Sequence, residues 1–162
     1  MSTSTQVILN GMKDWDDWMG VIRTMALGAD VWDTLDPNKS EQDIKVLRAP
    51  TRPVISDVKV AASGQPLVLY SELDTDEREH FRQLQSDYMY DRREYDQKRK
   101  ALEDIRIKII ESIKRDYITY TYNCTTVRSL LLILKDRIAP IDKIRERELI
   151  KQYKAIYKPL KA

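Results

Sequence analysis

Acidic side chains near the start of the chain are the first residues whose type and spacing could do chemistry. They form two short clusters, Asp14, Asp16 and Asp17 and then Asp30, Asp33 and Asp36. Carboxylate oxygens bind calcium when they alternate along a tight loop that contains a turn glycine. Neither cluster has this pattern, so we interpret these carboxylates as helix caps and as favourable charges at helix starts.

Histidine and cysteine are too scarce to build most catalytic or metal-binding arrangements. The chain has one histidine, His80, and one cysteine, Cys124, together with four glycines that do not cluster. This composition excludes multi-histidine metal sites, thiolate zinc sites, an internal disulfide and a glycine-rich phosphate loop. We therefore predict that the protein is not an enzyme and that it uses no metal, cofactor or small-molecule substrate. Because disulfides are absent, a reducing, cytoplasmic location is expected.

Basic side chains that could contact nucleic-acid phosphates lie in the middle and at the end of the chain. They are Lys98, Arg99, Lys100, Lys151, Lys154 and Lys158. Acidic residues are mixed through both regions, and no nucleic-acid reader motif is present. Any affinity for RNA should therefore be weak, nonspecific and sensitive to salt. Tyr153 and Tyr157 keep helical spacing, so we interpret them as core or interface residues.

The charge of the chain is distributed unevenly along its 162 residues. The net charge is −6 over residues 1–80, +3 over residues 81–134 and +5 over residues 135–162. The acidic N-terminal part of one subunit could therefore attract the basic C-terminal part of another subunit. No apolar run approaches the about 20 residues that a membrane span needs, and the N-terminus lacks the pattern of a signal peptide. We therefore expect no membrane partner.

A tryptophan-bearing helical unit is predicted over residues 13–35, where apolar side chains recur at i, i+3, i+4 and i+7. All three tryptophans of the chain lie there, at Trp15, Trp18 and Trp32. Asp14 is expected to be the N-cap, and Gly28 is expected to end the helix in the left-handed conformation. Residues 1–12 are predicted to be a flexible N-terminus.

The next region changes in character. Residues 36–73 contain four of the six prolines and are predicted to form an extended connector. From Leu67 to Ala139 there is neither glycine nor proline, so residues 74–158 are predicted to form a helical body. Asp74, with Glu77 three residues later, indicates the start of a long charged helix.

This long helix is expected to run over residues 75–118, continuing through its charge-dense middle. Its apolar ladder has polar gaps at Asp91 and Lys98, so a coiled coil built on it would be imperfect. The segment TYTYNCTT, residues 119–126, then interrupts the helical pattern. Asn123, Thr125 and Thr126 are candidate caps for the helix that follows.

Two further helices are predicted after this interruption. A leucine-rich helix ends at Pro140, and a last helix begins at about Ile141. We expect the tryptophan-bearing helix and the leucine-rich helix to bury against one another. The candidate core and assembly residues are Trp15, Trp18, Ile22, Trp32, Leu130 and Leu134. The predicted fold is therefore an all-α helical bundle with one long charged helix and a proline-rich extended connector, forming a single domain over residues 8–158.

Two blocks of the sequence resemble a known family. Residues 9–37 read LNGMKDWDDWMGVIRTMALGADVWDTLDP, and residues 116–158 read DYITYTYNCTTVRSLLLILKDRIAPIDKIRERELIKQYKAIYK. Together with the APTRPVISDV between them and the tyrosine-rich charged helix, they resemble the N-terminal capsid region of Gag polyproteins from copia-type LTR retrotransposons, particularly those of filamentous fungi. The order of the blocks carries this resemblance.

The resemblance implies a helical capsid domain that associates with copies of itself into virus-like particles around element RNA. The chain departs from a whole Gag because one cysteine and one histidine cannot build a zinc knuckle, and because it stops at Ala162, where such polyproteins continue. We therefore expect a fragment, a degenerate copy or a host gene derived from one. Two alternatives stay open: a non-viral helical adaptor that dimerises through the 74–118 helix, and a weak, nonspecific RNA-binding accessory protein.

Overall fold

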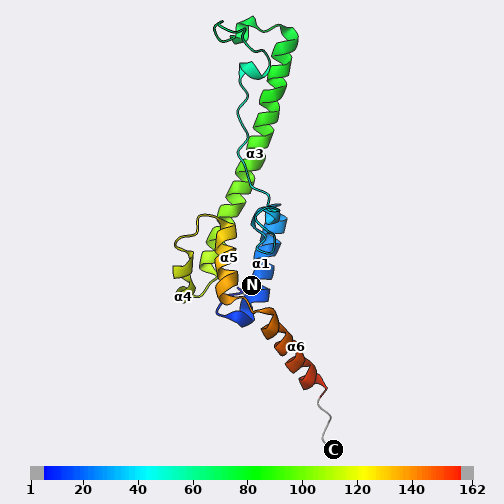
Figure 1. The fold of residues 1–162 in the computed structure, drawn as a ribbon, viewed down its shortest axis with the longest axis vertical. Helices are drawn as coiled ribbons and strands as arrows, with labels where there is room; N and C mark the ends of the chain where they lie inside the picture. Colours follow the sequence, from blue (N-terminus) through cyan, green and yellow to red (C-terminus); the bar gives the residue numbers. More distant parts are fainter. Residues whose placement is uncertain (1–5, 158–162) are drawn as a thin grey trace, which may run out of the picture. The chain divides into compact units, whose positions relative to one another are not determined.

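The computed structural model describes residues 6–157, and this part of the chain is helical and contains no strand. The predicted all-α fold is therefore confirmed. The helices are α1 (Trp15–Gly28), α2 (Trp32–Leu35), α3 (Thr75–Glu111), α4 (Arg115–Ile118), α5 (Val127–Ile138) and α6 (Asp142–Ile156), as drawn in Figure 1. In the described range, none of them combines the length and the apolar content that crossing a membrane requires.

The chain divides into two compact units. Unit 1 consists of Met1–Ile44 together with Leu102–Ala162, and unit 2 consists of Lys45–Ala101. Helix α3 is continuous through the boundary, since it begins in unit 2 and ends in unit 1. The two units are therefore described one at a time.

Leu9 pairs with the chain just after α3 and determines where that helix ends. The backbone N–H of Leu9 donates to the carbonyl oxygen of Ser112 at 2.8 Å, and the N–H of Lys114 donates to the carbonyl oxygen of Leu9 at 2.9 Å. The two stretches meet in a parallel bridge between Leu9 and Ile113. Leu9 is fully buried, so the prediction of a flexible N-terminus is wrong at this residue.

The predicted long helix is correct at its start and too long at its end. The Glu77 N–H donates to a carboxylate oxygen of Asp74 at 2.8 Å, which confirms the predicted cap. This hydrogen bond is the main reason why the pKa of Asp74 lies below its usual value. Helix α3 continues through its charged middle but ends at Glu111 instead of near residue 118, because the following residues are extended to pair with Leu9.

The start and the end of α1 also differ from the predicted chemistry. Asp14 occupies the N-cap position, but its carboxylate accepts from the backbone N–H of Asn10 at 3.0 Å instead of capping the helix. The left-handed residue after the helix is Asp30, with φ 56°, and not Gly28. The N–H of Val31 donates to the carbonyl oxygen of Ala26 at 2.9 Å, which is the long hydrogen bond of a Schellman motif.

The core of unit 1 draws on α1, α2, α5 and the end of α3. Its buried apolar residues are Leu9, Trp15, Trp18, Ile22, Ala26, Val31, Leu35, Ile105, Ile109, Ile113, Val127, Leu130, Leu131, Leu134 and Ile138. Helix α2 packs against both α1 and α5, so the tryptophan-bearing and leucine-rich helices contribute to one core. Trp32 is only half-buried, and the guanidinium of Arg23 lies 5.6 Å from the centroid of its ring.

Helix α5 is held at its start and along one side. Thr126 is the cap among the three candidates, because its hydroxyl accepts from the N–H of Ser129 at 3.1 Å. The side chain of Arg128 donates to the carbonyl oxygen of Lys39 at 2.8 Å, and Lys135 Nζ lies 2.8 Å from Asn38 Oδ1. These two bonds tie α5 to the turn that follows α2.

In unit 2, the connector runs alongside the first part of α3 (Figure 1). The ring centroids of Tyr70 and Phe81 lie 6.2 Å apart, and Lys59 lies 3.7 Å from the carboxylate of Glu77. Phe81 belongs to the apolar ladder of α3 and is buried. The connector therefore packs on the ladder within the same chain.

Two identical substitutions, Leu134→Ala and Leu149→Ala, test the assignment of the core. Leu134 is fully buried in α5, whereas Leu149 is 66% exposed in α6. We expect Leu134→Ala to lower the free energy of unfolding by about 2–5 kcal/mol, because it leaves a cavity. Leu149→Ala should change it by less than about 0.5 kcal/mol. Urea unfolding of dilute protein, followed by tryptophan fluorescence, measures both, and equal losses would contradict the core.

Candidate functional site

The acidic clusters are used in local contacts. Asp16 pairs with Arg145 at 3.0 Å, Asp33 pairs with Lys39 at 3.0 Å, and Asp36 accepts from the N–H of Asn38 at 2.9 Å. Within residues 6–157 there is no group of three or more histidine, cysteine or acidic side chains that could hold a metal ion. The carboxylates of these three aspartates therefore serve turns and ion pairs of unit 1.

The basic residues predicted to touch RNA belong to different units. On α3 in unit 2, Lys98 pairs with Glu94 at 3.2 Å, while Arg99 and Lys100 are exposed. On α6 in unit 1, Lys151 pairs with Glu148 at 3.7 Å and Lys154 is exposed. Lys158 lies outside the described residues. Each group thus keeps acidic neighbours on its own helix.

The most unusual surface of unit 1 is an apolar face of α6 that residues 6–157 leave uncovered. This face, called here the α6 face, consists of Leu149, Ile150, Tyr153, Ile156 and Tyr157. Its side chains are 47% to 78% exposed. They recur at spacings of three, four and seven, so they share one side of the helix. The rings of Tyr153 and Tyr157 pack together with centroids 4.5 Å apart, and neither tyrosine belongs to the core of this chain.

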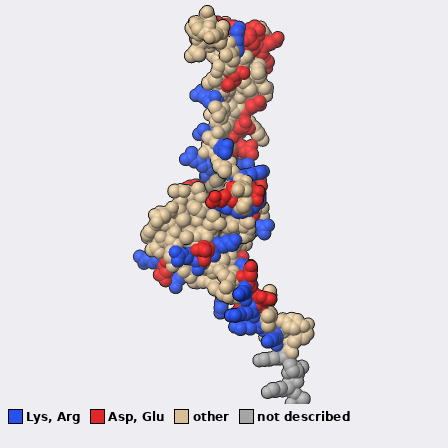
Figure 2. Space-filling view, in the orientation of Figure 1, with Lys and Arg blue, Asp and Glu red and all other residues tan. Residues whose placement is uncertain are grey.

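A second unusual surface lies where the segment 119–126 passes over α5. No residue from Tyr117 to Val127 carries a charge, although one third of all residues in the chain are charged. Figure 2 shows a broad uncharged area on this part of unit 1. Tyr120 and Tyr122 are 39% and 72% exposed there, so aromatic surface is available for contact with another molecule.

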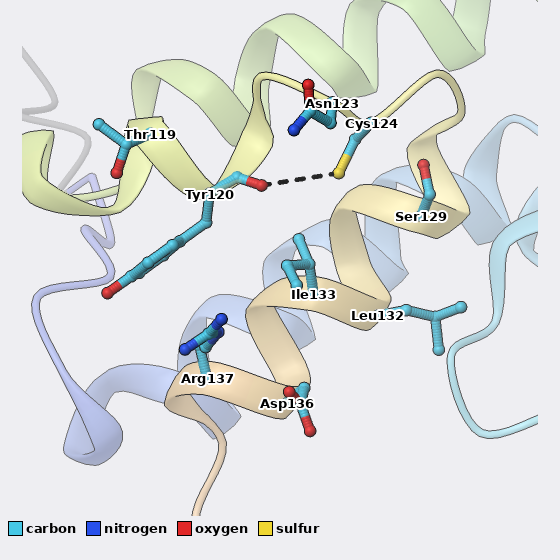
Figure 3. Close-up of a pocket in the computed structure, with 9 residues that line it drawn as sticks. All are labelled: Thr119, Tyr120, Asn123, Cys124, Ser129, Leu132, Ile133, Asp136 and Arg137. Atoms are coloured by element: carbon cyan, nitrogen blue, oxygen red, sulfur yellow. Dashed lines mark hydrogen bonds between the residues drawn. The ribbon is translucent and has the colours of Figure 1, made fainter.

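Within this area there is a hollow of about 540 Å³, called here the Tyr120 pocket. Its walls include Tyr120 and Cys124 from the upper segment and Leu132 and Ile133 from α5 (Figure 3). Thr119, Asn123, Ser129, Asp136 and Arg137 complete its lining. The hollow is open to solvent, so it suits side chains that another molecule lays across it better than an enclosed small ligand.

The charged groups of the Tyr120 pocket lie at one end of α5. The guanidinium of Arg137 lies 5.2 Å from the ring centroid of Tyr120, which is a cation–π contact. Asp136 is exposed and forms no ion pair with any residue in the described range. The pocket therefore presents apolar walls with one available carboxylate beside them.

The upper wall of the pocket is held by α3. Arg106 donates from Nη1 to the carbonyl oxygen of Cys124 at 3.4 Å and from Nη2 to that of Thr125 at 2.5 Å. The hydroxyl of Thr121 donates to the carbonyl oxygen of Ile118 at 2.6 Å. The segment that forms the upper wall is thus held by hydrogen bonds from Arg106 on α3, and the shape of the pocket depends on this side chain.

The sequence of residues 119–126 predicts an interruption between helices and does not by itself indicate the Tyr120 pocket. The sequence does carry one signal for this pocket, which is the absence of charged residues from Tyr117 to Val127. An exposed loop of this length in such a highly charged chain would ordinarily contain several charged residues. Comparison with protein-family models, with curated proteins and with solved structures finds no match. The resemblance to copia-type Gag therefore remains an interpretation of the sequence blocks.

The substitution Arg106→Met tests how the pocket wall is held. It keeps an unbranched apolar stem of similar width but removes the guanidinium group and with it both hydrogen bonds to the segment. Since a hydrogen bond to a charged group contributes about 1.5–3 kcal/mol, amide exchange at residues 122–126 should become at least about tenfold faster. Labelling of the Cys124 thiol should accelerate in parallel.

The matched control for this measurement is Arg99→Met, because Arg99 is exposed on α3 in unit 2. It should leave the exchange of residues 122–126 unchanged. Hydrogen exchange followed by mass spectrometry gives both rates. Unchanged exchange in Arg106→Met would show that other contacts hold the wall.

Proposed function

We propose that this chain is a structural, Gag-like capsid domain that associates with copies of itself into retrotransposon virus-like particles. The observation that carries the proposal is the α6 face, which stays exposed on a unit that already has a core of its own. An exposed, contiguous apolar surface marks an interaction site far more often than scattered apolar residues do. The order of the two sequence blocks supports the capsid assignment.

The distribution of charge supports association between like chains. Residues 1–80 carry a net charge of −6, and residues 135–162 carry +5. The ion pair between Asp16 and Arg145 is one contact between these oppositely charged parts within a chain. The same attraction between chains would favour assembly and would weaken as salt is added. In this proposal the basic residues bind RNA weakly and without sequence specificity. Assembly takes place in the cytoplasm.

The packing of α3 weighs against the adaptor alternative. A coiled-coil dimer would need the apolar ladder of this helix at its seam. Phe81, Ile105 and Ile109 belong to that ladder, and all three are buried against other parts of the same chain. Dimerisation through residues 74–118 would have to displace this packing.

The proposal predicts that the full chain assembles beyond a dimer as its concentration rises. Size-exclusion chromatography with light scattering should show a mass that grows with concentration, and electron microscopy should show particles. Met89→Glu is the control, because Met89 is exposed on α3 and lies outside the α6 face. It should assemble like the unchanged chain.

Two outcomes would contradict this proposal. A monomer at every accessible concentration would contradict self-association, and a dimer of fixed mass would favour the adaptor alternative.

A second measurement distinguishes the RNA-binding alternative. The light scattering should be repeated above about 200 mM salt with and without RNA, since contacts that depend only on phosphates fade at this salt concentration. Particles that require RNA at low salt and vanish at high salt would favour the RNA-binding alternative.

A further inference from the structure

The α6 face and the Tyr120 pocket are two uncovered surfaces of unit 1 with complementary form. We propose that they are the two halves of one contact, in which α6 of one copy docks into the Tyr120 pocket of the next copy. The inference rests on the proposed self-association and names the surfaces by which the copies join.

The Tyr120 pocket can receive the side chains of a helix. Its lining includes Tyr120, Leu132 and Ile133. Figure 3 shows Ile133 on the side of α5 that faces the segment 119–126, whereas Leu132 extends from another side of the helix. The hollow of about 540 Å³ is open to solvent, so the side chains of a helix can lie across it. Binding of an amphipathic helix in an apolar groove uses anchors at spacings of three, four and seven residues.

The α6 face presents anchors at these spacings. Tyr153 lies near its middle, with Leu149 four residues before it and Ile156 three residues after it. Tyrosine is enriched among the residues that dominate binding energy, since it offers a large apolar ring and a polar hydroxyl. We therefore assign Tyr153 as the central anchor.

Charge complements this fit. Lys154 follows the anchor directly and forms no ion pair with another residue in the described part of the chain. Asp136 lines the pocket and is likewise without an ion pair there. Docking of Tyr153 would bring the ammonium group of one copy close to the carboxylate of the next. The Asp136 carboxylate would then be covered together with an opposite charge, since an unpaired buried carboxylate would be strongly unfavourable. Arg137 would keep its cation–π contact with Tyr120.

Pairing of two α6 faces fits the chain less well. Asp142 and Glu146 lie seven residues before Leu149 and Tyr153, so they share the side of the helix that carries the face. A parallel pair would place these carboxylates opposite their counterparts.

The symmetry of the contact follows from its two different halves. Because each copy carries one α6 face and one Tyr120 pocket, every added copy leaves a free face at one end and a free pocket at the other. Such head-to-tail contacts close into rings or extend into open assemblies. The contact therefore accounts for growth beyond a dimer.

Mixing two defective variants tests the inference. Tyr153→Glu removes the anchor, and Ile133→Glu places a charge in the pocket wall. Each variant alone should be monomeric at concentrations where the unchanged chain assembles. An equimolar mixture should form a one-to-one dimer and nothing larger, because it contains one intact face and one intact pocket.

Two further variants keep the test sound. Ile133 is half-buried, so Thr119→Trp serves as a second pocket variant that fills the hollow from an exposed position. Tyr122→Glu is the matched control, because Tyr122 is exposed in the same segment but does not line the pocket. The Tyr122→Glu variant should assemble normally.

A charge exchange tests the pairing of Lys154 with Asp136. Asp136→Lys alone and Lys154→Glu alone should each weaken association at least tenfold, and the two changes together should restore it.

The outcomes separate this inference from the proposed function. If the unchanged chain assembles and Tyr153→Glu or both pocket variants assemble equally well, the docking contact is overturned and self-association stands. If the mixture of Tyr153→Glu and Ile133→Glu, or of Tyr153→Glu and Thr119→Trp, stays monomeric, the head-to-tail contact is overturned. If the unchanged chain never assembles, both proposals are overturned.

Discussion

The hydrogen bond between Trp18 and Ser112 is the contact on which unit 1 depends. The indole N–H of Trp18 donates to the hydroxyl oxygen of Ser112 at 2.8 Å, and both residues are buried. The same hydroxyl donates to the carbonyl oxygen of Lys108 at 2.6 Å, and the carbonyl of Ser112 accepts from Leu9. The N-terminal region, with Leu9 and Trp18, therefore meets the end of α3 at one serine about one hundred residues later. A buried donor that lost its partner there would destabilise the unit.

This junction explains why the candidate surfaces lie on the outside of unit 1. Once α1, the end of α3 and α5 share a core, the segment after α3 is left to pass over α5, where Arg106 holds it in place. The Tyr120 pocket forms between this segment and α5. Helix α6 begins after Pro140, contributes no residue to the core and keeps its apolar side chains exposed. The residues of the core are thus different from the residues of the proposed contact surfaces.

Local signals made part of this fold predictable from the sequence. The start of α3 at Asp74 and the extent of α5 between Thr126 and Pro140 depend on caps and breakers that lie within a few residues of the helix ends. The end of α3 could not be predicted, because it is determined by pairing with Leu9, about one hundred residues earlier in the chain. The periodicity of α6 indicates an apolar face but cannot tell what covers it. The Tyr120 pocket escaped prediction because it depends on tertiary packing between two segments.

A double-mutant cycle on Trp18→Phe and Ser112→Ala tests most directly the claim that the Trp18–Ser112 hydrogen bond holds unit 1 together. Each of the two changes removes a different partner of this buried bond. Ser112→Ala alone should lower the free energy of unfolding by about 1–3 kcal/mol, since it leaves the indole N–H unsatisfied. In the Trp18→Phe background the same change should cost less, with a coupling energy of at least about 0.5 kcal/mol. Thr24→Ala, at an exposed position of α1, is the control and should change stability by less than about 0.5 kcal/mol. Strictly additive losses would contradict the claim that this contact holds the unit together.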